Sequence, residues 1–426
     1  MCPAPRERAG MKTYKPTSIA LPGLIGLARP SVAPICLLLT LAITASACAA
    51  GNRDPETGRI RVLYVGEPTG SSPYPMLESE PLILPDPVKA STVVFSLDIA
   101  RRSVRQYMPR TYESLSSYQV LILSDANADV FTASQLQWYS DAVMEGGSGL
   151  VMIGGNEAFG GRGGQRSWGT TPVEDVLPVN SLDERWTEGK VVIVDANHPM
   201  VASIPIGPNL EWMKYYDGNE VELKTGASEL AQMLRMAKPP APFWATWESG
   251  KGRTFAMAGD WTPAGGVIFM RWEYYGDFAV NLMLYLSKNE LPEDLETVHK
   301  ARGKFLEYRW AKAYMFTVMD FGEKFGANMN PVANIIDEAE SRYADATQAY
   351  LEQDLGTSLE ALDDSLGSLA RGIQRAMRLK NQAMLWIYTV EWTTISGTFA
   401  ASGFAVWTLM IRRRLYREIG STKFGR

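Results

Sequence analysis

The chain has 426 residues, 46% of them hydrophobic, and a formal net charge of −5 at neutral pH. That length allows more than one folding unit with a sizeable core. The negative charge argues against nucleic acid as a partner, because surfaces that bind nucleic acid are basic. Three cysteines and two histidines are too few for a disulfide framework or for a metal centre rich in cysteine or histidine.

The first 50 residues are typical of a secretory leader or an N-terminal anchor. Basic residues between Arg6 and Arg29 precede an apolar segment, residues 31–44, that is followed by small residues. The sequence Ala45-Ser46-Ala47 is an A-x-A cleavage site, and Cys48 follows it directly. It resembles a loose bacterial lipobox, with alanine where leucine is usual, so Cys48 is a candidate for lipidation. The alternatives are a cleaved signal without lipid and an uncleaved anchor helix.

The other end of the chain predicts a membrane-spanning helix. Residues 392–411 form a run of 20 residues without a charge, which at ~1.5 Å per residue spans about 30 Å, the thickness of a bilayer core. Arginines at 412–414 and 417 follow at once and predict a cytoplasmic C-terminus. Trp386 and Trp392 suit the opposite interface. A buried core helix is the alternative. Both ends therefore predict that the residues between them lie outside the cytoplasm.

The segment after the leader has the pattern of an α/β fold. We expect strands at 59–67, 91–99, 119–125 and 149–155, with a proline-containing irregular loop at 68–87. A helix before the last of these strands begins with a capping box formed by Thr132 and Gln135. The alternation of strand and helix predicts a parallel sheet with helices on both faces.

Three further strands are expected at 190–195, 242–248 and 253–260, followed by a helix at 271–288. The sequence Ser249-Gly250-Lys251-Gly252 is typical of a hairpin turn between the last two strands. The fold class we predict is a flavodoxin-like sheet flanked by helices.

Several motifs in order resemble the class I glutamine amidotransferase-like superfamily, in particular its membrane-anchored branch of putative glutamine amidotransferases. The resemblance covers roughly residues 59–288 and includes LILSDAN, GGSGLVMIGGNEAFGG, TTPVEDVLPV, NHPM and GKGRTFAMAGDW. These motifs indicate the fold. They do not establish the activity, because proteins that share a fold often catalyse different reactions or none.

The resemblance implies a cysteine nucleophile on the turn after the strand at 149–155, with a histidine to activate it. Gly154 stands at or beside that position, and every cysteine of the chain lies in the first 48 residues. Ser148 and Ser167 are nearby but lack the context of a serine nucleophile. His198 precedes a proline, which favours a turn histidine over a catalytic one. We therefore expect no glutaminase activity, and enzymatic activity of any kind is less expected than binding.

Polar side chains follow several of the expected strands. Because ligands of open α/β sheets bind beyond the carboxyl ends of the strands, these side chains are candidates for a binding crevice. Their oxygen atoms would suit sugar hydroxyls, a cationic ligand or a divalent cation, and no other cofactor is predicted. The alternative is that they cap turns and helices. The candidates are Glu67, Asp125, Asn127, Asn156, Glu157 and Asp260.

The last third before the membrane segment is helical. A helix is expected at 293–321, and a second set of apolar residues recurs at helical spacing between 332 and 350. Leucines between Leu355 and Leu369 alternate steps of four and three, a heptad seam, with Thr357 and Glu360 as a capping box. We expect an antiparallel hairpin that packs within the chain. Oligomerisation through the leucines is the alternative.

The predicted organisation is a leader at 1–50, an α/β domain at 51–290, a helical stalk at 291–382, a membrane helix at 383–412 and a short tail at 413–426. The function we predict is that of a single-pass envelope protein of a prokaryote, whose catalytically degenerate domain binds a ligand, a glycan or a partner protein. One alternative is a hydrolase that uses acidic residues or a metal in the crevice. The other is a purely structural subunit of a membrane complex, held partly by small residues of the membrane helix such as Gly397.

Overall fold

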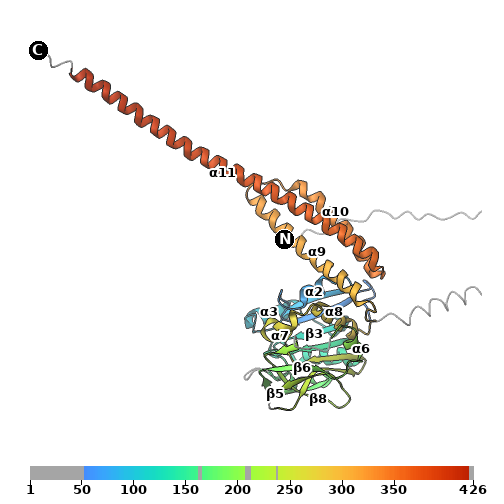
Figure 1. Ribbon diagram of the computed structural model, residues 1–426. Helices are drawn as coiled ribbons and strands as arrows, with labels where there is room; N and C mark the ends of the chain where they lie inside the picture. The colour runs from blue at the N-terminus through green and yellow to red at the C-terminus, as the bar shows by residue number, and fades with distance from the viewer. Residues whose placement is uncertain (1–51, 162–165, 207–212, 237, 422–426) are drawn as a thin grey trace, which may run out of the picture. The chain divides into compact units, whose positions relative to one another are not determined.

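The computed structural model describes residues 52–161, 166–206, 213–236 and 238–421, with side chains up to residue 416. The predicted leader, with Cys48, lies outside the described residues, as does the end of the basic tail. The described residues belong to one compact unit, in which an α/β domain is followed by long helices (Figure 1).

A nine-stranded mixed sheet forms the core of the α/β domain, in the order β2-β1-β3-β4-β11-β10-β9-β6-β7. The strands from β2 to β11 are parallel, and the remaining ones are antiparallel to their neighbours. A parallel sheet was therefore the right prediction for the first half only. The strands are β1 (Ile60–Gly66), β2 (Ile83–Lys89), β3 (Val120–Ser124), β4 (Gly149–Ile153), β6 (Gly189–Ile193), β7 (Lys214–Tyr215), β9 (Ser228–Arg235), β10 (Ala241–Ser249) and β11 (Gly252–Met257).

The central strands form because their sequences are apolar throughout. Every residue of β3 and β4 is buried, as expected for strands covered on both faces. The predicted hairpin between β10 and β11 is present, with Ser249 paired to Gly252. A separate two-stranded sheet, which the sequence analysis missed, consists of β5 (Val179–Trp186) and β8 (Gly218–Leu223).

Short helices surround the sheet (Figure 1). The predicted capping box of Thr132 and Gln135 is present at the start of α5. The helix expected at 271–288 begins at Tyr275 and ends at Leu286, and a separate helix that was not expected precedes it at residues 263–270. The helices of the domain are α2 (Tyr74–Ser79), α3 (Leu97–Tyr107), α4 (Tyr112–Ser116), α5 (Ala133–Asp141), α6 (Pro199–Ala202), α7 (Pro263–Met270) and α8 (Tyr275–Leu286).

The expected strand at 91–99 is wrong. The second strand of the sheet is β2, which lies in the segment that we interpreted as an irregular loop. Its two prolines, Pro85 and Pro87, are tolerated because β2 is an edge strand that pairs only with β1. Val93 and Val94 are exposed in the loop that follows, and Leu97 begins α3.

Three long helices follow the domain: α9 (Leu295–Lys324), α10 (Asn330–Leu351) and α11 (Leu355–Ser421). All three pack together, so the expected two-helix hairpin is part of a three-helix arrangement. Leu362 and Leu369 of the heptad seam are buried within it. The predicted capping box at Thr357 is wrong, because α11 already begins at Leu355 and the Asp354 carboxylate accepts the Thr357 backbone N–H at 3.1 Å.

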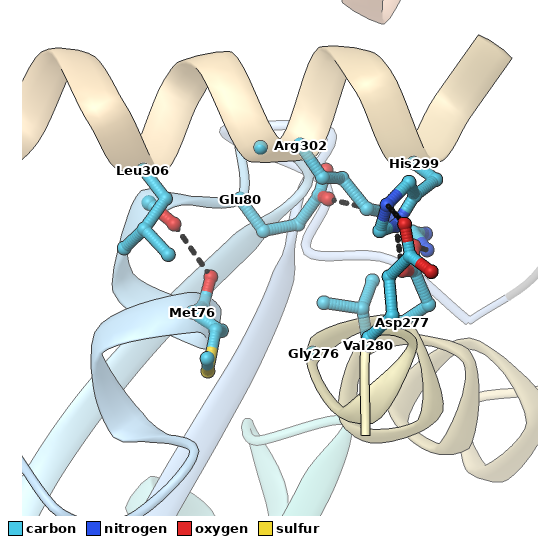
Figure 2. Close-up of a pocket in the computed structure, with 11 residues that line it drawn as sticks. Met76, Glu80, Gly276, Asp277, Val280, His299, Arg302 and Leu306 are labelled. Carbon is cyan, nitrogen blue, oxygen red and sulfur yellow. Dashed lines mark hydrogen bonds and ion pairs between the residues drawn. The ribbon is translucent and has the colours of Figure 1, made fainter. Parts of the chain in front are cut away.

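A buried ion network joins the first turns of α9 to the α/β domain (Figure 2). Arg302 Nε donates to Glu80 at 2.9 Å, and its Nη1 donates to Asp277 at 2.8 Å. His299 lies 2.6 Å from the other oxygen of Asp277. These side chains line a cavity of about 100 Å³ together with Met76 and other apolar groups. The network holds α9 against α2 and α8 at its N-terminal end.

Within the described residues, one helix is long and apolar enough to cross a membrane. Its span is Leu355–Tyr416, and the apolar part of it is not covered by other parts of the chain. The side chains of Trp386, Trp392 and Phe399 are exposed. Length and composition therefore support a membrane helix at the C-terminus.

Candidate functional site

The strands β3 and β4 end side by side at the parallel half of the sheet, and Ser124 pairs with Ile153 there. The chain turns sharply after each of them. Asp125 has a φ of +47°, a conformation that non-glycine residues adopt rarely and often at functional sites. Asp125 N donates to the Ile153 carbonyl oxygen. The backbones at the ends of the two strands are thus hydrogen-bonded to each other. We take this corner as the centre of the candidate site.

Gly154 has no room for a side chain. A Cβ built on it would lie 2.5 Å from the backbone oxygen of Ala258 and 2.9 Å from Asn219 Oδ1. Both distances are below those that real Cβ contacts show. A residue with a side chain at position 154 would therefore require a shift of the backbone at Ala258 or of the Asn219 side chain.

Four carboxyl groups gather at the ends of β1, β3, β4 and β11. Their exposed fractions are 5% for Glu67, 3% for Asp125, 1% for Glu157 and 6% for Asp260. Charged groups are rarely buried this deeply without compensation. The topology explains why they meet, because four neighbouring parallel strands end at the same edge of the sheet.

Each carboxyl group is hydrogen-bonded to the loops around it. Glu67 accepts the Ser91 hydroxyl at 3.0 Å. Glu157 accepts the Thr92 backbone N–H at 2.6 Å and the Asn127 amide at 2.8 Å. Asp125 accepts the Glu157 backbone N–H, and Asp260 accepts the backbone N–H and the hydroxyl of Thr262. The same side chains thus stabilise turns, which is the alternative role considered for them.

Burial and mutual repulsion keep protons on this cluster. Burial, and secondarily the charge of Asp260, raises the pKa of Glu67 to about 7. Burial raises the pKa of Asp260 to about 6. The pKa of Asp125 lies well above its ordinary value, because it is buried and because Asp260, Glu67 and Glu157 are near. At neutral pH the cluster therefore combines protonated carboxyl groups, which donate hydrogen bonds, with carboxylates, which accept them.

The two predicted amides have different environments. Asn127 donates to Glu157 and also accepts the Asp129 backbone N–H at 2.8 Å. Asn156 Oδ1 is buried and has no hydrogen-bond partner among the described residues. An unsatisfied buried oxygen is uncommon in folded proteins. Among the candidate residues, Asn156 is thus the one whose side-chain oxygen has no hydrogen-bond partner among the described residues.

The residues considered for catalysis lie elsewhere. His198 caps α6 by accepting the Met200 backbone N–H at 3.3 Å, and its other nitrogen lies 3.2 Å from the Tyr285 hydroxyl. Burial lowers its pKa. Ser148 donates to the Tyr118 carbonyl oxygen, and Ser167 caps a short turn. His198 is therefore a capping histidine, in agreement with the interpretation as a turn residue.

Several residues of the site escaped the sequence analysis. Ser91 and Thr92 hold Glu67 and Glu157, but they fall in the segment mistaken for a strand. Arg185 on β5 donates to the Gly155 carbonyl oxygen and pairs with Asp217 at 2.7 Å. Asn219 on β8 accepts the Gly155 backbone N–H at 3.0 Å. No local signal points to Arg185 or Asn219, because the second sheet brings them here from far along the chain.

In the part of the chain that the structure describes, no group of three or more His, Cys, Asp or Glu residues is arranged to hold a metal ion. The carboxyl groups bond to protein donors, as given above. The side chains of the cluster offer hydrogen-bond donors and acceptors.

Residues 84–288 match the family described as "Putative glutamine amidotransferase". The α/β domain belongs to this family. The expectation drawn from the motifs is thus confirmed, and the matched residues include β3, β4 and the turns that carry Asp125 and Gly154. Family membership concerns the domain and its fold. Whether this amidotransferase-like domain acts on an amide is a separate question.

Solved structures resemble the chain more weakly. Two proteins of Salmonella typhimurium, the cytoplasmic proteins STM1381 (strain LT2) and STM3548, are 23% and 20% identical to it. Each match covers 53% of this chain and 99% of the other, with a TM-score of 0.44. A β-galactosidase from Rahnella sp. R3 is 14% identical, with a TM-score of 0.33, over 60% of this chain and 34% of its own. These values are too low to bear on function. No curated protein matches the chain.

Proposed function

We propose that this protein is anchored in a membrane and that its amidotransferase-like domain binds a polar ligand without hydrolysing amides. The observation that carries the proposal is the filled space at Gly154, where a Cβ would lie 2.5 Å from the Ala258 oxygen. Amide hydrolysis by a covalent route needs a nucleophile at that turn. Residues 49–426 contain no cysteine, so no neighbouring residue supplies the same nucleophile.

The acidic cluster is the ligand-binding element of this proposal. Glu67, with a pKa of about 7, is partly protonated at neutral pH, whereas Asp260, with a pKa of about 6, is mostly ionised there, and Asn156 has an unpartnered oxygen. Protonated carboxyl groups, carboxylates and an amide together match a ligand that both donates and accepts hydrogen bonds. Sugar hydroxyl groups have that property, and so a glycan is the ligand class that we favour over a partner protein or a cation.

The membrane anchor of the proposal is the C-terminal part of α11. Its apolar stretch is exposed along its length, and arginines at 412–414 follow. By the positive-inside rule the C-terminus is cytoplasmic and the α/β domain extracytoplasmic. An epitope tag after Arg426 tests this orientation. Accessibility of the tag from outside intact cells would contradict it.

Glycan binding is tested with the full-length protein in detergent on an array of bacterial glycans. We expect binding that Glu67→Gln and Asn156→Ala weaken and that Glu145→Gln leaves unchanged, because Glu145 is exposed on another part of the domain. Absence of binding to any glycan, or equal binding by all variants, would overturn the role of the cluster.

A hydrolase that uses acidic residues is the second candidate. The observation in its favour is the pKa of Glu67, about 7, which is the value that a general acid needs near neutral pH. Hydrolysis of array glycans with a bell-shaped pH profile, abolished by Glu67→Gln, would support this candidate over simple binding.

A further inference from the structure

The segment between α9 and α10 packs against α11 near Lys380. The Lys380 amino group lies 5.7 Å from the centre of the Phe321 ring. A Cβ on Gly322 would lie 3.5 Å from Lys380 Cβ. Met329 at the end of this segment belongs to the same buried cluster as Ala376. The last residues of α9 and the loop that joins it to α10, residues 321–329 and called the turn from here on, are therefore level with Lys380 along the axis of α11.

The nearly uncharged part of α11 begins immediately after Lys380. Residues 381–411 contain one charged side chain, Glu391. At ~1.5 Å per residue this stretch of helix is about 46 Å long. A bilayer with its headgroup layers is about 40–45 Å thick. With residues 392–411 in the hydrocarbon core, Lys380 lies 12 residues, about 18 Å of helix, outside that core, on the side of the opposite headgroup layer.

The turn presents side chains that suit such a surface. Phe321 is 43% exposed, although it is a large apolar residue. Its ring centre lies 4.8 Å from that of Phe325. Lys324 is exposed and pairs with Asp320, one turn earlier in α9. Aromatic rings flanked by lysines are favoured at the interface between headgroups and acyl chains. Because Asp320 and Glu323 offset the lysines, the aromatic rings, not the net charge, are the attractive element.

We propose that the turn at 321–329 rests in the headgroup layer of the bilayer that α11 crosses. Phe321 and Phe325 enter this layer, and the contact fixes the tilt of the three-helix arrangement relative to the membrane. This inference depends on the proposed membrane anchor. It adds a second lipid contact, made by a segment that precedes the membrane helix by more than fifty residues.

The test uses nitroxide spin labels on single cysteines in the full chain, with the three leader cysteines changed to serine. The protein is reconstituted in vesicles of phosphatidylcholine and phosphatidylglycerol. The labels replace Glu323 in the turn, Glu360 near the other end of the helical part and Phe399 in the apolar stretch. Collisions of a label with oxygen show that it is exposed to lipid, and collisions with a water-soluble nickel complex show that it is exposed to water.

We expect the label at 399 to be accessible to oxygen only, and the label at 360 to be fully accessible to nickel. The label at 323 should show severalfold lower nickel accessibility than that at 360, with raised oxygen accessibility. In the double variant Phe321→Ser and Phe325→Ser, the nickel accessibility of the label at 323 should rise to that of the label at 360. Equal values at 323 and 360, with 399 in lipid, would overturn this inference and leave the anchor intact. Nickel accessibility at 399 would overturn both.

A contact with a second copy of the chain is distinguished by dilution. It would protect the label at 323 from both oxygen and nickel, and the protection would fall as the ratio of protein to lipid is lowered. That result would contradict a lipid contact.

Discussion

The side chain of Asp125 fills the space beside Gly155. A Cβ built on Gly155 would lie 2.7 Å from Asp125 Cβ and closer still to its carboxyl group. The turn after β4 is thus shaped around the turn after β3. The buried carboxyl group of Asp125 thus links the backbone geometry of this corner to the acidic cluster.

Gly155→Ala should destabilise the α/β domain. The added methyl group overlaps Asp125 in a fully packed region, and overpacking costs about 1–3 kcal/mol or more. Urea titration followed by tryptophan fluorescence measures the change in the free energy of unfolding. Gly70→Ala is the matched control, since a Cβ at Gly70 would meet no atom within 4 Å.

Asp125→Gly should rescue Gly155→Ala in part. The substitution removes the overlapping side chain, and the φ of +47° at position 125 suits glycine. In a double-mutant cycle the two changes together should cost less than the sum of the single changes. Strict additivity would show that the two residues do not restrain each other.

The stability of the α/β domain should fall as the pH rises from about 4 to about 7. An unfolded glutamate has a pKa near 4.3, whereas Glu67 has a folded pKa of about 7. Between these values the folded chain holds a proton that the unfolded chain has released. The stabilisation is therefore complete below pH 4 and lost through pH 7, an effect on the order of 3 kcal/mol.

Glu67→Gln should reduce this pH dependence, because glutamine stays neutral in both states, while Asp125 and Asp260 keep their raised pKa values and part of the slope. Urea midpoints at pH 5, 6 and 7.5 provide the comparison. Glu113→Gln, a change at an exposed position, should leave the slope as in the natural sequence. An unchanged slope in Glu67→Gln would mean that Glu67 does not hold a proton in the folded protein.

Arg302→Met should weaken the attachment of α9 to the α/β domain. The change leaves Glu80 and Asp277 buried without their cationic partner, and breaking such a buried pair costs about 3–5 kcal/mol. Arg309→Met on the same helix removes a more exposed pair with Glu78 and should cost no more than about 1 kcal/mol. Protease cleavage within α9 should rise in the first variant only. Similar effects of the two changes would argue against the network.

Leu362→Ala should lower stability without changing the oligomeric state. Leu362 is fully buried between the helices of one chain, so truncation leaves a cavity that costs about 2–5 kcal/mol. Thermal unfolding and light scattering in detergent measure the two properties. Dissociation of an oligomer at unchanged stability would favour the alternative in which the leucine seam joins separate chains.

Sequence patterns predicted the elements whose signal is local. The all-apolar β3 and β4, the capping box of α5 and the β10–β11 hairpin follow from neighbouring residues alone. β2 was missed because its two prolines argue against a strand unless its edge position is known. The sequences of β5 and β8 are polar, and their apolar and polar residues alternate only weakly. Their pairing therefore depends on tertiary contacts.

For the candidate site, the sequence predicted which residues end the strands but not what surrounds them. Glu67, Asp125, Glu157 and Asp260 could be named because each follows a recognisable apolar strand. Their burial could not be inferred, since it results from loops such as the one with Ser91 and Thr92. The steric role of Gly154 likewise needed the position of Ala258 on a neighbouring segment. Ligand binding at these residues stays a prediction.

Release of ammonia from L-glutamine by the purified full-length protein tests the central claim most directly. A protein of the same superfamily with an intact cysteine serves as the positive control. Because a side chain at position 154 would clash with its neighbours and residues 49–426 contain no cysteine, we predict release no faster than in buffer alone across pH 5–8. Release above that background, abolished by Asp125→Asn together with Glu157→Gln, would contradict the claim that this amidotransferase-like domain binds without hydrolysing amides.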